Sequence, residues 1–233
     1  MNKTNNPHLF VTKANSSAGI SSVVFSLINQ YMKYHNSKTI NLLDIGGGRG
    51  WGELLYDKKH INYYCLDLKK SERIGNITYI KGDITDPSLS ANVSADIGVQ
   101  FDIIFSKDTF EHILNPWDAT ANMVNLLKSG GIITIFTPFS WRYHASPYDA
   151  YRYTHTGLQY IVERLGKIKK IHGGYIRCGN INGFWKNKKD HTLDGTPHLN
   201  CLESFYAGVK IDGYQFDKSN LDSDLSWDQD DTK

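Results

Sequence analysis

Short apolar runs rich in β-branched and aromatic residues recur along the chain, separated by longer polar or helical stretches. These runs lie at residues 40–45, 61–66, 77–80, 101–105 and 131–136. Residues 20–34 differ, because their apolar positions are spaced by three and four, which predicts an amphipathic helix. Strands that alternate with helices predict a parallel sheet with right-handed crossovers and a ligand site at the carboxyl ends of the strands.

A glycine-rich turn follows the first predicted strand. After Leu42 and Leu43 the sequence reads DIGGGRGWG, so that Asp44 precedes glycines at positions 46, 48 and 50. Such glycines let the backbone pass close to a ligand, and a helix beginning near Trp51 would offer its N–H groups to an anion or a carboxylate. The dinucleotide fingerprint needs a third glycine three residues after the second, and the P-loop needs Gly-Lys-Ser or Gly-Lys-Thr. The turn matches neither pattern.

Acids also follow the next two predicted strands. Asp67 ends the run INYYCLD, where its carboxylate could accept hydrogen bonds from both hydroxyls of a ribose. Asp83 follows the run at 77–80. Because parallel strands end at one edge of a sheet, we expect Asp44, Asp67 and Asp83 to belong to one site.

The glycine turn and these acids resemble the first motifs of the class I S-adenosylmethionine (SAM)-dependent methyltransferases. Residues 101–106, 110–114 and 126–135 resemble the family's fourth strand, the helix behind it and the Gly-Gly turn into the fifth strand. The resemblance implies a Rossmann-like α/β fold, with a seven-stranded, mostly parallel sheet, an antiparallel last strand and helices on both faces. The remaining elements would be a helix at 156–165, terminal strands at 168–176 and 204–212, and a loop insertion at 177–203.

The resemblance also implies a cofactor and the residues that bind it. The cofactor would be SAM, and the product S-adenosylhomocysteine. The Asp83 carboxylate would accept from the adenine amino group, and the backbone N–H of Ile84 would meet the ring. The residues that the resemblance assigns to the cofactor are Asp44, Gly46, Gly47, Gly48, Asp67, Leu68, Asp83, Ile84 and Ser106.

Composition favours one compact domain. The chain has 233 residues, of which 40% are hydrophobic, enough for one α/β core. We expect a single methyltransferase domain at 1–216 and an acidic tail at 217–233. No run reaches the roughly 20 apolar residues of a membrane span, and the first residues lack a signal-peptide profile. Three scattered cysteines form no zinc spacing and no disulfide framework, which favours a reducing cytoplasm.

The charge distribution bears on the partners. A net charge of +2 argues against a dedicated nucleic-acid binder. The basic residues between Arg164 and Lys189 have no acid among them. This basic segment is either a solvated surface or a binding surface for a phosphorylated or otherwise anionic substrate.

The segment at 138–155 is long for a loop and contains aromatic rings, two histidines, two arginines and an aspartate. Long loops in compact domains are usually functional. The pattern His-x-x-Pro-x-Asp-x-x-Arg-x-Thr-x-x-Gly-Leu resembles bacterial methyltransferases linked to surface polysaccharides and glycans, although relatives commonly have Asp-Tyr-Trp-Arg where this chain has DAYR. The residues expected at the acceptor are Tyr148, Asp149, Tyr151 and Arg152. The alternative is a structural lid whose aromatic rings pack on the sheet.

A hydroxyl acceptor gains from a general base, because it is a weak nucleophile at neutral pH. His144 is the first candidate, since it lies in the loop and imidazole suits this role. Asp108 and His112, which follow the fourth strand, are the next candidates. No metal site is expected, because a cation site needs clustered carboxylates and only Asp108 and Glu111 lie close together after the fourth strand.

The sequence argues against two other classes of methyltransferase. DNA amino-methyltransferases carry an Asn/Asp/Ser-Pro-Pro-aromatic run after the fourth strand, where this chain has SKDTF. The cytosine-C5 class needs a nucleophilic cysteine beside that strand, and the sequence has none there.

The sequence therefore predicts a SAM-dependent O-methyltransferase that acts in the cytoplasm on a saccharide, nucleotide-sugar or glycan-linked acceptor. One alternative is a methyltransferase of a phosphorylated small metabolite or lipid precursor, and another is a non-catalytic SAM-binding subunit. The expected partner is a small-molecule or glycan acceptor and not a nucleic acid, and a homodimer is left open.

Overall fold

The computed structural model describes residues 20–48, 59–69, 73–74, 77–145, 147–178 and 201–211. The helices are α1 (Ile20–Tyr34), α3 (Leu89–Ile97), the 3₁₀ helix η1 (Phe110–His112), α4 (Pro116–Leu126) and α5 (His155–Glu163). The strands are β1 (Ile40–Ile45), β2 (Ile61–Asp67), β3 (Arg73–Ile74), β4 (Ile77–Lys81), β5 (Phe101–Lys107), β6 (Leu127–Pro138), β7 (Ile168–Cys178) and β8 (Cys201–Lys210). The predicted helix after the glycine turn, most of the predicted loop insertion and the acidic tail lie outside the described residues.

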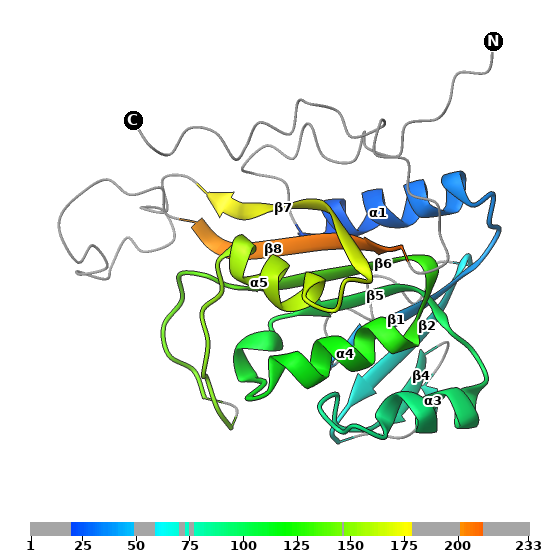
Figure 1. Ribbon diagram of the computed structural model, residues 1–233, viewed down its shortest axis with the longest axis horizontal. Helices are drawn as coiled ribbons and strands as arrows, with labels where there is room; N and C mark the ends of the chain where they lie inside the picture. Colours follow the sequence, from blue (N-terminus) through cyan, green and yellow to red (C-terminus); the bar gives the residue numbers. More distant parts are fainter. Residues whose placement is uncertain are drawn as a thin grey trace, which may run out of the picture.

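The strands form one sheet in the order β3-β4-β2-β1-β5-β6-β8-β7 (Figure 1). The neighbours from β4 to β6 pair in parallel, whereas β8 lies between β6 and β7 and is antiparallel to both. This arrangement confirms the predicted Rossmann-like sheet with its antiparallel last strand. The additional strand is the two-residue β3, which pairs antiparallel with β4.

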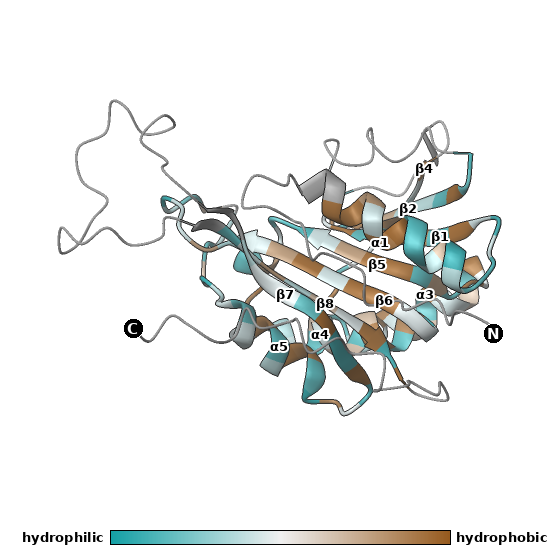
Figure 2. Ribbon diagram, turned by 90° about the horizontal axis from the view of Figure 1, so that it is seen from above, coloured by the Kyte–Doolittle hydropathy of each residue, from teal (hydrophilic) through white to brown (hydrophobic). Residues whose placement is uncertain are grey.

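Helices cover both faces of the sheet (Figure 1). On one face, Val24 and Leu27 of α1 join Phe105 of β5 in one hydrophobic cluster. On the opposite face, Met123 of α4 and Leu158 of α5 belong to a second cluster. The middle strands are hydrophobic along most of their length (Figure 2), as expected for a sheet buried on both sides. Among the described residues, no helix is both long and apolar enough to cross a bilayer.

A buried carboxylate fixes the end of α1 to the amino ends of the central strands. Asp102, at the start of β5, accepts hydrogen bonds from the Tyr31 hydroxyl and from Lys128 Nζ, both over 2.8 Å, and from the backbone N–H of Asn41 over 2.7 Å. Asp102 is only 6% exposed, so these donors replace the water that it loses on burial. The end of α1 is thereby held where β1 and β5 begin, away from their carboxyl ends.

The strand register places the carboxyl ends of the parallel strands side by side. Ile45, the last residue of β1, pairs with Leu66 of β2 and with Ser106 of β5. Asp67, the last residue of β2, pairs with Lys81 of β4. Ligands of open α/β sheets bind at this edge.

The predicted helix at 110–114 is wrong in length, because it is the single turn η1. Its last backbone bond ends at Ile113, which is already extended, with φ −88° and ψ 114°. A new helix, α4, begins at Pro116, and the side chain of Asn115 accepts a hydrogen bond from the backbone N–H of Asp118. Proline suits the first helical position because the N–H that it lacks would be unpaired there. The residues between β5 and α4 therefore stay in a short turn at the strand's carboxyl end.

Candidate active site

The Asp44 carboxylate lies beneath the glycine turn. Asp44 is 1% exposed, and the Tyr63 hydroxyl donates a hydrogen bond to its Oδ2. A Cβ added to Gly47 would overlap this carboxylate. Burial raises the pKa of Asp44 to about 7. Asp44 therefore supports the turn from below, and a contact between Asp44 and the cofactor stays a prediction.

Gly46 connects the turn to the segment after β5. Its φ is +71°, a backbone conformation that favours glycine. A Cβ at this position would lie 2.5 Å from both Cγ2 and Oγ1 of Thr109. Thr109 is held in place, because its hydroxyl makes 3.1 Å hydrogen bonds to the carbonyl oxygens of Ile45 and Lys107. The segments that follow the first and fourth of the predicted strands are thus in direct contact.

Gly46→Ala is expected to lower the free energy of unfolding by about 3 kcal/mol and to weaken SAM binding. The change combines a left-handed backbone strain of about 1 kcal/mol with overlap against Thr109. Gly48→Ala is the matched control, because its φ is +50° and no described atom lies within 4 Å of the added Cβ. Urea unfolding compares the two variants, and calorimetry with SAM compares Gly46→Ala with the wild type, because Gly48 is itself a predicted cofactor residue. Equal losses of unfolding free energy in the two variants would show that the Thr109 contact does not restrict the turn.

Asp67 and Asp83 lie at the same edge of the sheet. Asp67 Oδ1 accepts a 3.0 Å hydrogen bond from the N–H of Lys69, and Asp83 Oδ1 accepts from the N–H and the hydroxyl of Thr85, both over 2.8 Å. Among the described residues, these hydrogen bonds use one oxygen of each carboxylate. The neighbouring side chains differ, because Leu68 is 60% exposed and Ile84 is 7% exposed. The roles of these four residues in cofactor binding stay predictions.

Asp67→Ala is expected to weaken SAM binding by about 1–3 kcal/mol, or roughly 5- to 150-fold in Kd, because the ribose loses its acceptor. Asp96→Ala is the control, since Asp96 is an exposed acid on α3. Calorimetric titration of both variants with SAM makes the measurement. If Asp67→Ala binds as tightly as Asp96→Ala, the ribose is not bound at the end of β2.

Two predicted site residues at the end of β5, Ser106 and Asp108, differ in burial. Ser106 is fully buried, and its hydroxyl donates to the carbonyl of Ile45 over 3.4 Å. Asp108 has a positive φ of +51° and forms an ion pair with Lys107, with 41% of the Asp108 side chain exposed. Asp108 is thus charge-paired on the strand end, and its role as a base stays a prediction.

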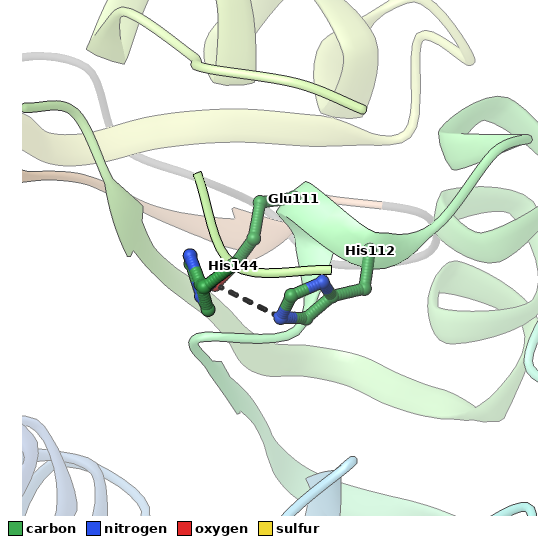
Figure 3. Close-up of side chains that lie close together, drawn as sticks. All are labelled: Glu111, His112 and His144. Carbon is green, nitrogen blue, oxygen red and sulfur yellow. Dashed lines mark ion pairs between the residues drawn. The ribbon is translucent and has the colours of Figure 1, made fainter. Parts of the chain in front are cut away.

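Three side chains converge beside this edge: Glu111 and His112 from η1, and His144 from the loop after β6 (Figure 3). The Nε2 atoms of His112 and His144 lie 3.5 and 3.7 Å from Oε1 of Glu111. Glu111 is fully buried, and its Oε2 accepts a 3.2 Å hydrogen bond from the Thr137 hydroxyl. No described residue donates a hydrogen bond to Oε1. Burial raises the pKa of Glu111.

Backbone hydrogen bonds hold the loop after β6 against η1. The N–H groups of Ala150 and Tyr151 both donate to the carbonyl of Glu111, over 2.7 and 3.3 Å. His112 Nδ1 lies 2.5 Å from the carbonyl oxygen of Tyr148. Because a carbonyl can only accept, Nδ1 is the protonated nitrogen of His112. The loop therefore fixes both the position and the tautomer of this histidine.

Asp149 holds His144 and Arg152 together. Its Oδ1 and Oδ2 accept hydrogen bonds from the Arg152 guanidinium over 2.5 and 2.8 Å, and these bonds lower the pKa of Asp149. Asp149 Oδ2 also accepts the backbone N–H of His144 over 2.8 Å and lies 3.2 Å from its Nδ1. Arg152 donates further to the carbonyls of Trp141 and Arg142. These contacts order the loop, and a contact of Arg152 with an acceptor stays a prediction.

The predicted acceptor tyrosines have different surroundings. Tyr148 is 53% exposed. The hydroxyl of Tyr151 donates to the carbonyl of Leu114 over 3.1 Å, and its ring lies 5.4 Å from that of Tyr153. Tyr151 thus packs the loop on the domain, as in the lid interpretation. Tyr143, which the sequence did not single out, is 75% exposed.

Sequence reasoning gave no site role to Glu111, Thr109 or Tyr63. The Glu-His pair after the fourth strand was an available signal for Glu111. Tyr63 and Thr109 gave no such signal, because their partners Asp44 and Ile45 lie 19 and 64 positions away in the chain.

A family model described as "Methyltransferase domain" matches residues 19–171. The match includes the glycine turn, the strand ends and the histidine cluster. No curated protein matches the sequence.

Solved structures share the fold at low sequence identity. An S-adenosylmethionine-dependent methyltransferase from Mesorhizobium loti is 13% identical, with a TM-score of 0.52 over 74% of this chain and 91% of that one. The 1,6-didemethyltoxoflavin-N1-methyltransferase from Burkholderia thailandensis, solved with 1,6-didemethyltoxoflavin and S-adenosylhomocysteine, is 13% identical, with a TM-score of 0.52 over 77% and 74%. The CurJ carbon methyltransferase is 14% identical, with a TM-score of 0.54 over 88% and 57%. At these identities the similarity concerns the fold.

Proposed function

The chain belongs to the methyltransferase-domain family and is a SAM-dependent methyltransferase, and we propose that it methylates a hydroxyl of a saccharide, a nucleotide sugar or a glycan-linked acceptor. A hydroxyl benefits from a base that removes its proton during methyl transfer. The observation that carries the proposal is the surroundings of His144, because its Nδ1 faces two acceptor oxygens and this supports a role for Nε2 in accepting such a proton.

The hydrogen bonds of His144 leave this nitrogen available. Its Nδ1 lies 3.1 Å from the carbonyl oxygen of Arg142 and 3.2 Å from Oδ2 of Asp149. Both neighbours are acceptors, so Nδ1 carries the proton and Nε2 has a lone pair. A carboxylate beside Nδ1 also stabilises the imidazolium that forms when Nε2 takes a proton. The His144 side chain is 34% exposed.

In the proposed reaction, the acceptor oxygen attacks the methyl carbon of SAM in line with the carbon–sulfur bond. That bond breaks, its electron pair stays on sulfur, and S-adenosylhomocysteine leaves. The hydroxyl proton passes to Nε2 of His144. The protein mainly aligns the two reactants and excludes water. The contact of Gly46 with Thr109 supports this geometry, because it joins the predicted cofactor turn to the segment that carries Glu111 and His112.

Exposed aromatic rings in the loop support a sugar as the acceptor. Tyr143 is 75% exposed and Tyr148 is 53% exposed, and they flank His144 in sequence. A tyrosine ring offers a large apolar face, while its own hydroxyl at the ring edge remains hydrated. Such rings can pack on the apolar face of a sugar while the acceptor hydroxyl meets the histidine.

Methyl-labelled SAM tests this proposal. The full chain is incubated with labelled SAM and with nucleotide sugars, oligosaccharides, phosphorylated metabolites and amines. The label is expected in an ether of a nucleotide sugar or an oligosaccharide, and heat-inactivated protein controls for chemical methylation. Transfer only to phosphorylated metabolites or amines would contradict the saccharide proposal and leave the methyltransferase assignment intact.

A further inference from the structure

We propose that Glu111, His112 and His144 bind a divalent transition-metal cation. The site would use one carboxylate oxygen and two imidazole nitrogens, which come from η1 and from the loop after β6 and point toward one another (Figure 3). Two nitrogens and one oxygen suit Zn²⁺, Mn²⁺, Fe²⁺, Co²⁺ or Ni²⁺. Mg²⁺ and Ca²⁺ prefer oxygen ligands alone.

The hydrogen bonds of the two histidines direct their lone pairs into the cluster. His112 Nδ1 donates to the carbonyl of Tyr148 over 2.5 Å. His144 Nδ1 faces the carbonyl of Arg142 at 3.1 Å. A neutral imidazole carries one proton, so both Nε2 atoms are unprotonated. Each Nε2 therefore turns a lone pair toward Oε1 of Glu111.

With both imidazoles neutral, three electron-rich atoms face one another. The three donor atoms lie within 4.8 Å of one another. Glu111 is fully buried, and its Oε1 has no hydrogen-bond donor among the described residues. A buried carboxylate oxygen without a donor is costly. A cation at the centre replaces this repulsion with three bonds.

Two of the three distances between the donor atoms fit a cation with little movement, and the two imidazole nitrogens lie within 4.8 Å of each other. Metal–ligand bonds of about 2.0–2.2 Å in a tetrahedral site separate the donor atoms by roughly 3.3–3.6 Å. The two Nε2 atoms lie 3.5 Å (His112) and 3.7 Å (His144) from Oε1 of Glu111. Small rotations of the imidazole rings therefore bring the donors into the range of a metal site.

Both proposed histidine ligands also have the supporting contact that metal-bound histidines usually have. A metal-bound histidine typically donates its other N–H to a carbonyl or a carboxylate. His112 does so to Tyr148, and His144 Nδ1 faces both the carbonyl of Arg142 and the carboxylate of Asp149. Three protein ligands leave at least one coordination position open, as in catalytic metal sites.

The cation would change how the proposed reaction removes its proton, and this consequence rests on the proposed function. An acceptor hydroxyl that takes the open position becomes more acidic on the cation and releases its proton to water. Nε2 of His144 then holds the cation in place of the proton. The cation site itself does not depend on the acceptor.

Cobalt titration of the full chain, without a histidine tag and without SAM or acceptor, tests the site. The protein is treated with EDTA, dialysed and titrated with Co²⁺ while the visible absorption is recorded. We expect saturation at one equivalent and displacement by Zn²⁺. Glu111→Gln and His144→Ala should each weaken Co²⁺ binding about 100-fold or more. His60→Ala is the matched control, because His60 is exposed in the turn before β2, and it should bind Co²⁺ as the wild type does.

The two ligand variants keep the test decisive. Glu111 is buried, so Glu111→Gln is compared with the wild type by urea unfolding, whereas His144 is partly exposed in a loop and its replacement is expected to leave the fold intact. Absence of saturable binding, or equal affinity in His144→Ala and His60→Ala, would overturn the cation site. Saturable binding that His144→Ala abolishes supports it, even if no saccharide is methylated, and the acceptor panel alone decides the proposed function.

Discussion

Replacement of His144 by alanine is expected to lower kcat about 10²–10⁴-fold, because the acceptor hydroxyl loses the group that takes its proton or, with the proposed cation bound, the cation that makes it acidic loses a ligand. The Kd for SAM should stay nearly unchanged, since the described partners of His144 lie in the loop after β6 and in η1. Steady-state turnover of the acceptor found in the labelled-SAM panel and calorimetry with SAM measure the two effects separately.

His60→Ala serves as the control for the loss of an imidazole elsewhere and should keep the wild-type kcat. Asp149→Asn adds a test of positioning, because it removes the negative charge beside His144 Nδ1 while an amide oxygen remains. It should lower kcat less than His144→Ala and shift the pH profile of kcat. A His144→Ala variant with full turnover would move the role of base to Asp108 or His112, or show that the transfer needs no base.

The free energy of unfolding should include a contribution from Asp44 that is lost as the pH rises from about 4 to about 7. Burial raises the folded-state pKa of Asp44 to about 7, whereas an unfolded aspartate has a pKa of about 3.9. Between these values the folded protein keeps a proton that the unfolded chain has released. Raising the pH then favours unfolding by about 1.4 kcal/mol per pH unit, or roughly 4 kcal/mol across the window.

Urea unfolding of the wild type and of Asp44→Asn at several pH values in this window measures the contribution. The amide does not titrate, and its oxygen can still accept the hydrogen bond from Tyr63. Relative to the wild type, Asp44→Asn should therefore become more stable as the pH rises. For Asp96→Asn, at an exposed position on α3, the curve of unfolding free energy against pH should run parallel to that of the wild type. Parallel curves for Asp44→Asn as well would mean that Asp44 is ionised in the folded protein throughout.

The main strands of the parallel sheet were predictable from the sequence because they are buried on both faces. Such strands are continuous apolar runs, and all five predicted runs lie in β1, β2, β4, β5 and β6. The helix at 20–34 was predicted with its observed bounds, since amphipathic spacing is a local property. The predicted helix at 110–114 and the later start predicted for β6 were wrong, because hydrophobic pattern alone does not show where a strand passes into a turn or a helix into a strand.

The glycine turn, the acids at the strand ends and the loop at 138–155 were also determined by the sequence, because parallel strands bring their carboxyl ends to one edge. Only the tertiary structure decided how these pieces meet. It buried Glu111 without a donor for Oε1, turned the Nε2 atoms of His112 and His144 toward that oxygen, and placed Asp44 beneath the turn. Apart from the contact between the neighbours Glu111 and His112, these contacts join segments far apart in the chain. No local spacing rule relates such residues, so the chemistry of the site depends on the packing of η1 against the loop.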